Sequence, residues 1–462
     1  MTIYRPRAVA QIDVPYLGTA EQRSRQEASK ESITLMLPIR GFSVECNNHN
    51  HADSARITVD WRDTSLDTRL LDDGVVTLFC GNADDYGNFE PNEANTIFIG
   101  HVRNAERELE ECEAGTLTIE AIDYTGLFLD AKPFGSSGIP LYSDTLEGAW
   151  RRICSQTPGA AVLADRLRAV GEDVDLNETL GKAVAERFAK LSRVPTHPDT
   201  DAWAVWQQCV GMLGLISFID QDVCIVTNAT NYYTQTDPPV FSWGTNLVSM
   251  SESRMNVNVK GGIGLVSFDP LTGKALEVFY PPIGDPRVQR KLTGAKRKKK
   301  APPPPALSGE RDKRHIFALW GVTDIAQLEL IAERVWHQLS RQELSGKLQT
   351  PHMFVKTVAG KDFDLLKLRS GDDIRVDFDQ GQRQYLSELP NDTARIVYLL
   401  GRGYPADAAR LLAKNVDALV ALGSTFYVDS VRKEMQLTED GGTFRVEITY
   451  LNKIEVSEGA VS

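Results

Sequence analysis

SARITVDW, at residues 54–61, is the stretch that decides the fold class of this chain. Its apolar and polar residues alternate from residue 55 onward: Ala55, Ile57, Val59 and Trp61 are apolar, whereas Arg56, Thr58 and Asp60 are polar. Because successive side chains of a strand point to opposite faces of a sheet, this alternation predicts a strand with one buried face and one solvated face.

Further strands are expected on both sides of this one. Short β-type stretches, separated by polar or glycine-bearing turns, lie at 7–14, 32–37, 42–46, 75–80, 96–109 and 115–122. This spacing is typical of a closed or rolled antiparallel barrel. We therefore expect residues 1–135 to form a first tube-type β-barrel domain.

The period of the apolar residues changes to that of helices between about residues 143 and 215. Asp144, followed three residues later by Glu147, predicts a capping box at a helix start. The apolar residues that follow share one helical stripe: Leu146, Ala149, Trp150, Ile153 and Cys154. A second helix is expected at 201–213. We therefore predict an inserted mixed α/β domain over 136–215.

Strands return after residue 215. They are expected at 216–220, 223–227, 254–259 and 276–280, and we interpret residues 216–290 as the start of a second β region. The run KRKKKAPPPP at 296–305 then interrupts the chain. Its charges repel one another and its prolines impose an extended form, so we expect a basic, Pro-rich flexible loop over 291–313.

The remainder, 314–462, is predicted to be a helix followed by the rest of a second tube β-barrel. Asp324 can cap a helix whose apolar face continues to about Glu343. Strands are expected at 346–355 and 373–379, a helical insertion at about 405–422, and a closing hairpin from 426–436 and 442–455. The predicted fold class is mixed and mainly β, with two tube-type antiparallel β-barrel domains and inserted helical or α/β segments.

Composition excludes several classes of protein. The 462 residues are 42% hydrophobic and 25% charged, without an apolar run of the roughly 20 residues that a membrane helix needs. We therefore expect no membrane segment. No signal-like apolar stretch follows the first arginines, so we expect synthesis in the cytoplasm. The net charge of −12 argues against a general grip on nucleic acid.

Motifs for catalysis or for metal and cofactor binding are missing from the sequence. It contains no GxSxG, HExxH or GxxxxGK[ST]. His49 and His51 lack further ligands at a suitable spacing, and the glycines of KGGIG at 260–264 lie between expected strands. We therefore assign no catalytic, metal or cofactor-binding residue and expect no enzyme.

The six cysteines form no CxxC pair, and we interpret them as mostly buried thiols. They are Cys46, Cys80, Cys112, Cys154, Cys209 and Cys224. Disulfides formed late, in an oxidising environment, stay open as an alternative, because pairing depends on geometry that the sequence does not give.

Two charged features of the sequence call for a role. Glu106, Glu108 and Glu110 share one face of a strand, and we interpret them as a solvated or channel-lining acidic stripe. The basic loop has no interleaved aromatic residues, and we interpret it as solvated, with contact to DNA or to a partner as the alternative. Its charged residues are Lys296, Arg297, Lys298, Lys299 and Lys300.

Several segments resemble the phage baseplate or tail hub family, also called late control protein D-like, and the hub region of type VI secretion spike proteins. They include FSVECNNHNHADSARITVDWRD at 42–63, IFIGHVRNAERE at 97–108, TLTIEAIDYTGLFLDAK at 116–132 and VSFDPLTGKALEVFYP at 266–281, the last similar to a second-barrel hairpin. The helix at 326–343, the phrase LLKLRSGDDIRV at 365–376 and the closing hairpin at 426–456 follow in the family's order. The basic loop and the helix at 405–422 depart from the family.

The resemblance implies a structural subunit of a homotrimer in the baseplate of a virion tail. Three chains with two barrels each would form a channel ring that adapts a sixfold tail tube to a threefold spike. The implied partners are the tail tube protein, the spike protein and other baseplate (wedge) proteins, with DNA passing through without specific binding. Two alternatives stay open: a hub that also degrades peptidoglycan, and a tail protein that contacts DNA through the basic loop.

Overall fold

A computed structural model of the chain describes residues 6–14, 33–47, 51–61, 68–71, 74–82, 89–108, 115–133, 135, 138–171, 174–181, 193–194, 196–197, 199–228, 237–242, 245–254, 262–268, 275–280, 315–320, 322, 324–340, 344–377, 389–401, 406–414, 424–438 and 441–452.

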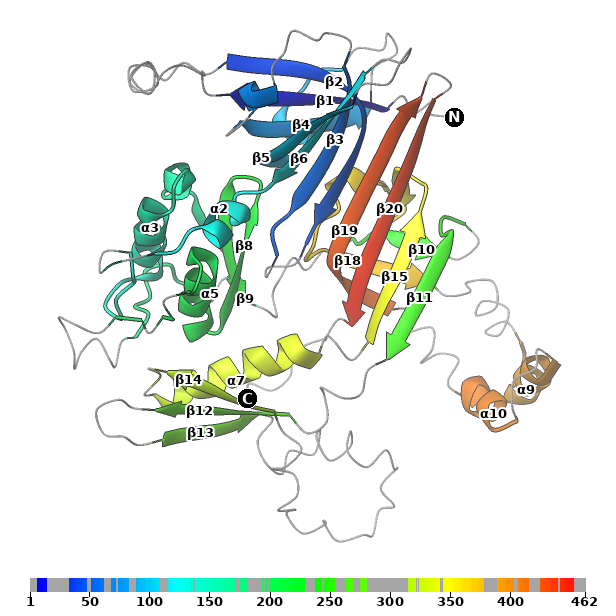
Figure 1. The fold of residues 1–462 in the computed structure, drawn as a ribbon. Helices are drawn as coiled ribbons and strands as arrows, with labels where there is room; N and C mark the ends of the chain where they lie inside the picture. Colours follow the sequence, from blue (N-terminus) through cyan, green and yellow to red (C-terminus); the bar gives the residue numbers. More distant parts are fainter. Residues whose placement is uncertain are drawn as a thin grey trace.

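The first barrel consists of strands β1 to β6, which close on themselves (Figure 1). They are β1 (Pro6–Val14), β2 (Ile33–Cys46), β3 (Ser54–Trp61), β4 (Val75–Asn82), β5 (Thr96–Glu108) and β6 (Gly115–Ile122). Their order is β1-β4-β5-β6-β3-β2, and antiparallel pairing of β1 with β2 closes the barrel. The predicted strands are confirmed, with the difference that 32–37 and 42–46 belong to the single long strand β2.

The alternation in β3 is that of a barrel strand with a dry inner face. Ala55, Ile57 and Val59 are buried in the barrel core, whereas Arg56 on the same strand is exposed. The core also contains Met353 and Leu366, which come from the second half of the chain. The inner face of the first barrel is therefore completed by distant residues.

A second set of strands surrounds a core of its own. It comprises β10 (Val240–Ser242), β11 (Ser249–Arg254), β15 (Leu344–Thr350), β18 (Asp373–Asp377), β19 (Ser424–Thr438) and β20 (Gly441–Asn452). The order runs β10-β18-β19-β20-β15-β11, with β10 parallel to β18 and the other neighbours antiparallel. Phe241, Ile374 and Tyr450 lie in its core. The predicted closing hairpin is confirmed as β19 and β20.

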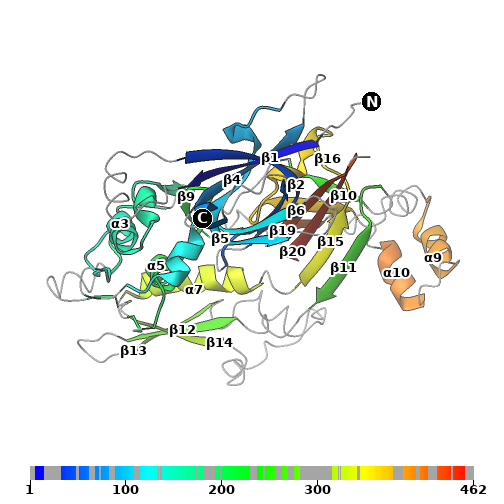
Figure 2. The ribbon, with the colours of Figure 1, turned by 45° about the horizontal axis from the view of Figure 1, so that its top comes forward.

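The two halves of the chain are joined into one sheet, because β19 also pairs with β2 (Figure 2). On the edge of β2 away from β3, β1 pairs as far as Pro38, and β19 takes over from Gly41 to Cys46. In the same way, β19 pairs with β18 up to Tyr427 and with β2 from Val431. Each long strand thus serves two partners in succession along one edge.

An α/β unit follows the first barrel. Its helices are α2 (Thr125–Asp130), α3 (Leu146–Gln156) and α5 (Ala202–Met212), and its strands are β7 (Leu167–Val170), β8 (Leu215–Asp220) and β9 (Val223–Asn228) in the order β7-β9-β8. The indole Nε1 of Trp150 donates to the carbonyl of Leu163 at 2.8 Å, and that of Trp206 to Ser217 Oγ at 2.9 Å. The tryptophans are therefore core residues, as predicted. The division of the chain into domains stays a prediction.

A third sheet with one helix is packed on the α/β unit. Strands β12 (Ile263–Phe268), β13 (Ala275–Tyr280) and β14 (His315–Trp320) form the order β13-β12-β14, covered by α7 (Ile325–Ser340). The hairpin at 266–281 was expected in the second barrel, and this is wrong: β12 pairs with β13 on one side and with β14 on the other, in a separate sheet. Local pattern predicts a hairpin but not the sheet that it joins.

The remaining described elements are short. A hairpin is formed by β16 (Phe354–Lys356) and β17 (Asp362–Asp364), and 3-10 turns lie at Thr68–Leu71, Glu93–Asn95, Ala160–Leu163 and Leu365–Lys367. Helices α9 (Asp392–Gly401) and α10 (Ala406–Lys414) pack on each other. The predicted helix at 405–422 is found as α10 over its described residues, whereas α9 was not predicted.

Several local predictions need correction or confirmation. The helix at Leu146–Gln156 is capped by Thr145, whose side chain accepts from Gly148 N at 3.1 Å; Asp144 instead accepts from Leu141 N and pairs with Arg152. The apolar face predicted after Asp324 begins later than expected: Ile325, the first residue of α7, is 54% exposed, and the packed residues begin at Leu328.

The five cysteines within the described ranges are buried free thiols, as predicted. They are Cys46, Cys80, Cys154, Cys209 and Cys224, and Cys112 lies outside those ranges. None of the helices that the structure describes is long and apolar enough to cross a membrane.

Candidate functional site

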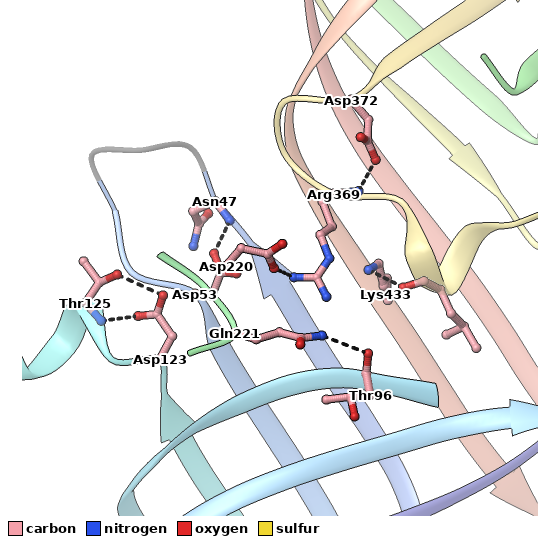
Figure 3. A network of polar contacts seen from close by, with 11 residues as sticks. Asn47, Asp53, Thr96, Asp123, Thr125, Asp220, Gln221, Arg369, Asp372 and Lys433 are labelled. Carbon is pink, nitrogen blue, oxygen red and sulfur yellow. Dashed lines mark hydrogen bonds and ion pairs between the residues drawn. The ribbon is translucent and has the colours of Figure 1, made fainter. Parts of the chain in front are cut away.

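The phrase Leu368-Arg-Ser-Gly-Asp372 forms a tight turn that is fixed on β19 (Figure 3). Gly371 has a φ of 96°, a left-handed conformation that favours glycine, and its N–H donates to the carbonyl of Val428 at 2.8 Å. Ser370 Oγ donates to the carbonyl of Asp429 at 2.7 Å. Asp372 accepts from the backbone N–H of Arg369 at 2.8 Å. These bonds hold the turn rigid and direct the Arg369 side chain away from the second sheet.

The tip of the β8–β9 hairpin meets this arginine. Asp220, the last residue of β8, accepts a hydrogen bond from Arg369 and forms an ion pair with it. Gln221 follows with a φ of 58°, as a two-residue hairpin turn requires, and its side chain donates to the carbonyl of Thr96 on β5 at 3.4 Å. The hairpin tip of the α/β unit therefore contacts the first barrel and the second sheet at once.

Two carboxyl groups of the first barrel lie beside this contact. Asp53 accepts from the backbone N–H of Asn47 at 2.7 Å, and its carbonyl accepts from Asp123 N at 2.9 Å. Asp123 is buried and accepts from the N–H and the hydroxyl of Thr125 at 3.0 and 2.9 Å. Burial raises the pKa of Asp53 to about 6, although Arg369 and Lys433 lower it. Burial and the Asp53 charge raise the pKa of Asp123 well above its usual range.

Lys433 on β19 completes this group of charges. It is 1% exposed, and its Nζ donates to the carbonyl of Leu366 at 2.7 Å. Burial lowers the pKa of the Lys433 ammonium, and the nearby Cys46, Asp53 and Asp372 oppose that shift. We call the group of Asp53, Asp123, Asp220, Arg369 and Lys433 the junction.

The junction fits a mechanical joint. Its charged groups come from the first barrel, the α/β unit and the second sheet, and they are hydrogen-bonded to the backbone or to one another. Buried polar groups need such partners, because a missing one costs about 1–3 kcal/mol. Two of the contacts at this place, Arg369 with Asp220 and Gln221 with the Thr96 carbonyl, cross between parts and are made only when the parts hold one relative orientation.

The second feature of the site is the outer face of the joined sheet. Strand register carries one row of polar residues across both halves of the chain: Glu120, Arg56, Ser43, Glu434 and Arg445. A second row contains Glu45, Arg432, Glu447 and Gln349. We call this surface the polar face. A groove of about 930 Å³ lies along it, with Arg40, Arg56, Arg432 and Arg445 in its walls.

Both ends of the polar face carry a strand edge that no described strand pairs with. β4 pairs with β5 only as far as His101, and Val102 N still donates to the carbonyl of Gly74 at 2.9 Å. The β5–β6 register shifts at Arg103, and Asn104 to Glu108 pair with β6 alone among the described strands. β11 pairs with β15 alone. Along this path the strands alternate in direction from β5 through β6, β3, β2, β19, β20 and β15 to β11. Within the described part of the chain, the polar face thus ends in two strand edges without a partner strand.

The structure places the predicted charged residues as follows. Glu106 and Glu108 are exposed on β5, on the polar face, and their role as a channel-lining stripe stays a prediction. Glu110, His49 and the basic loop at 296–300 lie outside the described residues. His51 is exposed, and no group of three potential metal ligands occurs among the residues that the structure describes.

Sequence reasoning did not assign Arg369, Lys433 or Asp123 to a site. Asp123 lies in the segment TLTIEAIDYTGLFLDAK and Arg369 in LLKLRSGDDIRV, so two of the segments that resemble the family contribute to the junction. A lysine at an inward position of a strand is the signal that could have revealed Lys433, because an inward charge needs buried partners.

No family model matches the sequence, and no curated protein matches it. Solved structures do. A tail protein from Neisseria meningitidis MC58 is 11% identical, with 97% of each chain covered and a TM-score of 0.53. This chain has the fold of a phage tail protein. The 43 kDa tail protein of prophage MuSo2 from Shewanella oneidensis is 9% identical, with 97% of this chain and 98% of that chain covered and a TM-score of 0.50.

A weaker similarity links the tail-protein fold of this chain to an Escherichia coli component of the type VI secretion system. The identity is 8%, the coverage 91% of this chain and 74% of that chain, and the TM-score 0.46. The two tail-protein structures agree with the resemblance found in the sequence.

Proposed function

We propose that this chain is a structural subunit of a phage tail or of a related injection machine, and that its copies join edge to edge into a ring around a channel. The observation that carries the proposal is a pair of strand stretches at the two ends of the polar face, 103–108 of β5 and 249–254 of β11, each with one edge that no described strand pairs with. Exposed edges present unpaired backbone groups that readily pair with another chain. A ring of copies removes both edges.

The direction of the strands supports this closure. Along the polar face each strand is antiparallel to the next, so β5 of a second copy would continue the alternation when placed beside β11. Both free stretches are six residues long, 103–108 and 249–254. A contact between different patches of identical chains generates a ring when the rotation closes.

Within the chain, two strands already pair in succession along one edge of a third strand. β1 leaves β2 at Pro38, and β19 pairs with the rest of that edge. β4 leaves β5 at His101 in the same manner, and the rest of that edge is open to a partner. We propose that β11 of the neighbouring copy takes this place, with the polar face, including Glu106 and Glu108, toward the channel.

The finer assignment follows the resemblance to hub proteins. A ring of three chains, each with two β parts, would present a sixfold face to a tail tube and a threefold face to a spike. We propose a homotrimer in the baseplate of the tail, with the tube, the spike and wedge proteins as partners and DNA or effectors passing through the channel. The role is mechanical.

Light scattering of the purified chain at several concentrations, with and without its spike, tests the proposal. The expected mass is three times 51.2 kDa. Ser251→Pro and Glu252→Pro form a matched pair, because neighbouring N–H groups of a strand point to opposite edges. The variant whose lost N–H faces β15 disturbs the pairing of β11 with β15. The variant whose lost N–H faces outward changes only the outer edge, where the neighbouring copy would pair, and is expected to stay monomeric. A wild-type monomer under all these conditions overturns the ring.

A further inference from the structure

The free end of the sheet at β11 carries more positive than negative charge. Lys347 Nζ lies 3.7 Å from Glu447, and the Arg445 guanidinium lies 3.8 Å from the same carboxylate. Two cations therefore share one carboxylate at the long end of ion-pair distance. Their side chains are 64% and 55% exposed, so both retain access from outside. In a chain of net charge −12, this corner has room for another carboxylate.

The Arg445 side chain already reaches toward the edge. Gln349 lies between β20 and β11, where its amide contacts Ser249 Oγ at 3.2 Å on one side and the Arg445 guanidinium on the other. The guanidinium thus lies over β15, one strand away from the free edge. Arginine has five N–H donors in a fork that suits a carboxylate, so further bonds can be made there.

The residues of β11 that lie on the polar face have short side chains. In the sequence SMSESR the residues that share the polar face are Ser249, Ser251 and Ser253, in register with Gln349, Lys347 and Ser345. Serine side chains are short. A long side chain on a strand added outside β11 can therefore pass over them and reach the cations on the next strands.

The partner strand has the complementary charge. Full-length antiparallel pairing of 103–108 from a second copy with 249–254 sets Glu108 opposite Ser249 and Glu106 opposite Ser251. Directly opposite residues share a face, so both glutamates then point to the polar face; a slip by one residue would turn them away. Glu106 and Glu108 are exposed in the single chain.

We infer that Glu106 and Glu108 of each copy bind Lys347 and Arg445 of the next copy, and that these contacts fix the register of the ring. The inference rests on the proposed ring and assigns the acidic stripe a role in subunit pairing. Like charges at the same places would oppose assembly, so the contact also excludes pairing in a wrong register.

Charge exchange tests the inference. Glu106→Lys/Glu108→Lys should raise the dissociation constant of the ring about ten- to a hundredfold in low salt, since each exposed pair contributes up to about fivefold and reversal adds repulsion. Lys347→Glu/Arg445→Glu should do the same, and the fourfold variant should recover most of the loss. The effect should shrink toward 1 M salt, where the screening length is about 3 Å.

A control variant separates specific contact from net charge. Asp165→Lys/Asp407→Lys changes the charge of the chain by the same amount at two exposed positions away from the sheet, and should leave the dissociation constant unchanged. A wild-type ring that tolerates the Glu106/Glu108 reversal as well as the control overturns this inference alone. Losses in both reversals without recovery in the fourfold variant also overturn it. A wild type that never forms a ring overturns the proposed function and this contact with it.

Discussion

Breaking the Arg369–Asp220 pair tests the junction most directly. Arg369→Met retains an apolar stem of similar reach and removes the charge, and Asp220→Asn retains the shape of the partner. The two side chains are 25% and 27% exposed. The pair is therefore intermediate between a surface ion pair, worth about 0–1 kcal/mol, and a buried pair, whose breaking costs about 3–5 kcal/mol.

We expect each single variant to lower the free energy of opening by about 1–2 kcal/mol, and the double-mutant cycle to give a coupling of about 1 kcal/mol. A chain of several parts need not unfold in one step, so a single unfolding free energy would mislead. Native-state hydrogen exchange of the β8 and β9 amides measures the opening free energy of the α/β unit itself.

The matched control is the Arg151–Glu147 pair on α3, with side chains 55% and 39% exposed. Its coupling should be about 0.3–0.5 kcal/mol. A coupling at the junction that is no larger than this would refute the reasoning, because the hairpin tip would then be held by packing alone.

Three further predictions follow from single features. Gly346→Ala should lower stability by about 1–3 kcal/mol in thermal melts, because a methyl group there overlaps the ring of the buried Tyr450, whereas Gly401→Ala, with nothing within 4 Å, should not destabilise. Asp53→Asn should gain stability relative to wild type as the pH rises from about 4 to 6, the window between the usual pKa of 3.8 and the raised one of about 6, and the gain should stay level above it. The sign follows because the folded state retains the proton that the unfolded state loses; urea midpoints that stay parallel across this window would contradict it. At pH 8 no more than one thiol per chain should react quickly with a thiol reagent, because burial raises the pKa of Cys46 to about 11 and that of Cys80 to about 12, and the other three described cysteines are buried as well; fast reaction of two or more would contradict this.

Local pattern was sufficient for much of the first barrel. The alternation at 54–61 predicts β3 over the same residues, Ser54–Trp61, and the apolar stripe after residue 145 predicts α3. The cap of α3 was misplaced by one residue, since Thr145 and Asp144 are both good capping residues and only the surrounding contacts decide between them. Helix α9 had a similar signal in Asn391, whose side chain accepts from Ala394 N at 2.9 Å.

The pairing of strands that lie far apart in the chain could not be predicted from the sequence. Arg432 and Glu45 become neighbours across β19 and β2, and no periodicity in either strand encodes the choice of partner. The same holds for the hairpin at 266–281, whose two strands were predicted while its sheet was not. The junction combines both cases, because its residues come from turns and strand ends that only the tertiary fold brings together.

The chemical nature of the junction explains why the parts keep one orientation. The first barrel and the second sheet share apolar core residues and are joined by β2–β19 pairing, whereas the α/β unit has a hydrophobic core of its own, so burial of apolar residues alone would allow that unit to dock at several angles. A charge pair discriminates more sharply, because Arg369 finds Asp220 of the α/β unit only in the observed arrangement. A subunit that transmits force between neighbours requires a fixed angle between its parts, and we infer that the polar junction supplies it at some cost in stability. Replacing Arg369 by Met should then raise the hydrogen-exchange rate of the β8–β9 hairpin more than that of β3, and equal changes in both would contradict this view.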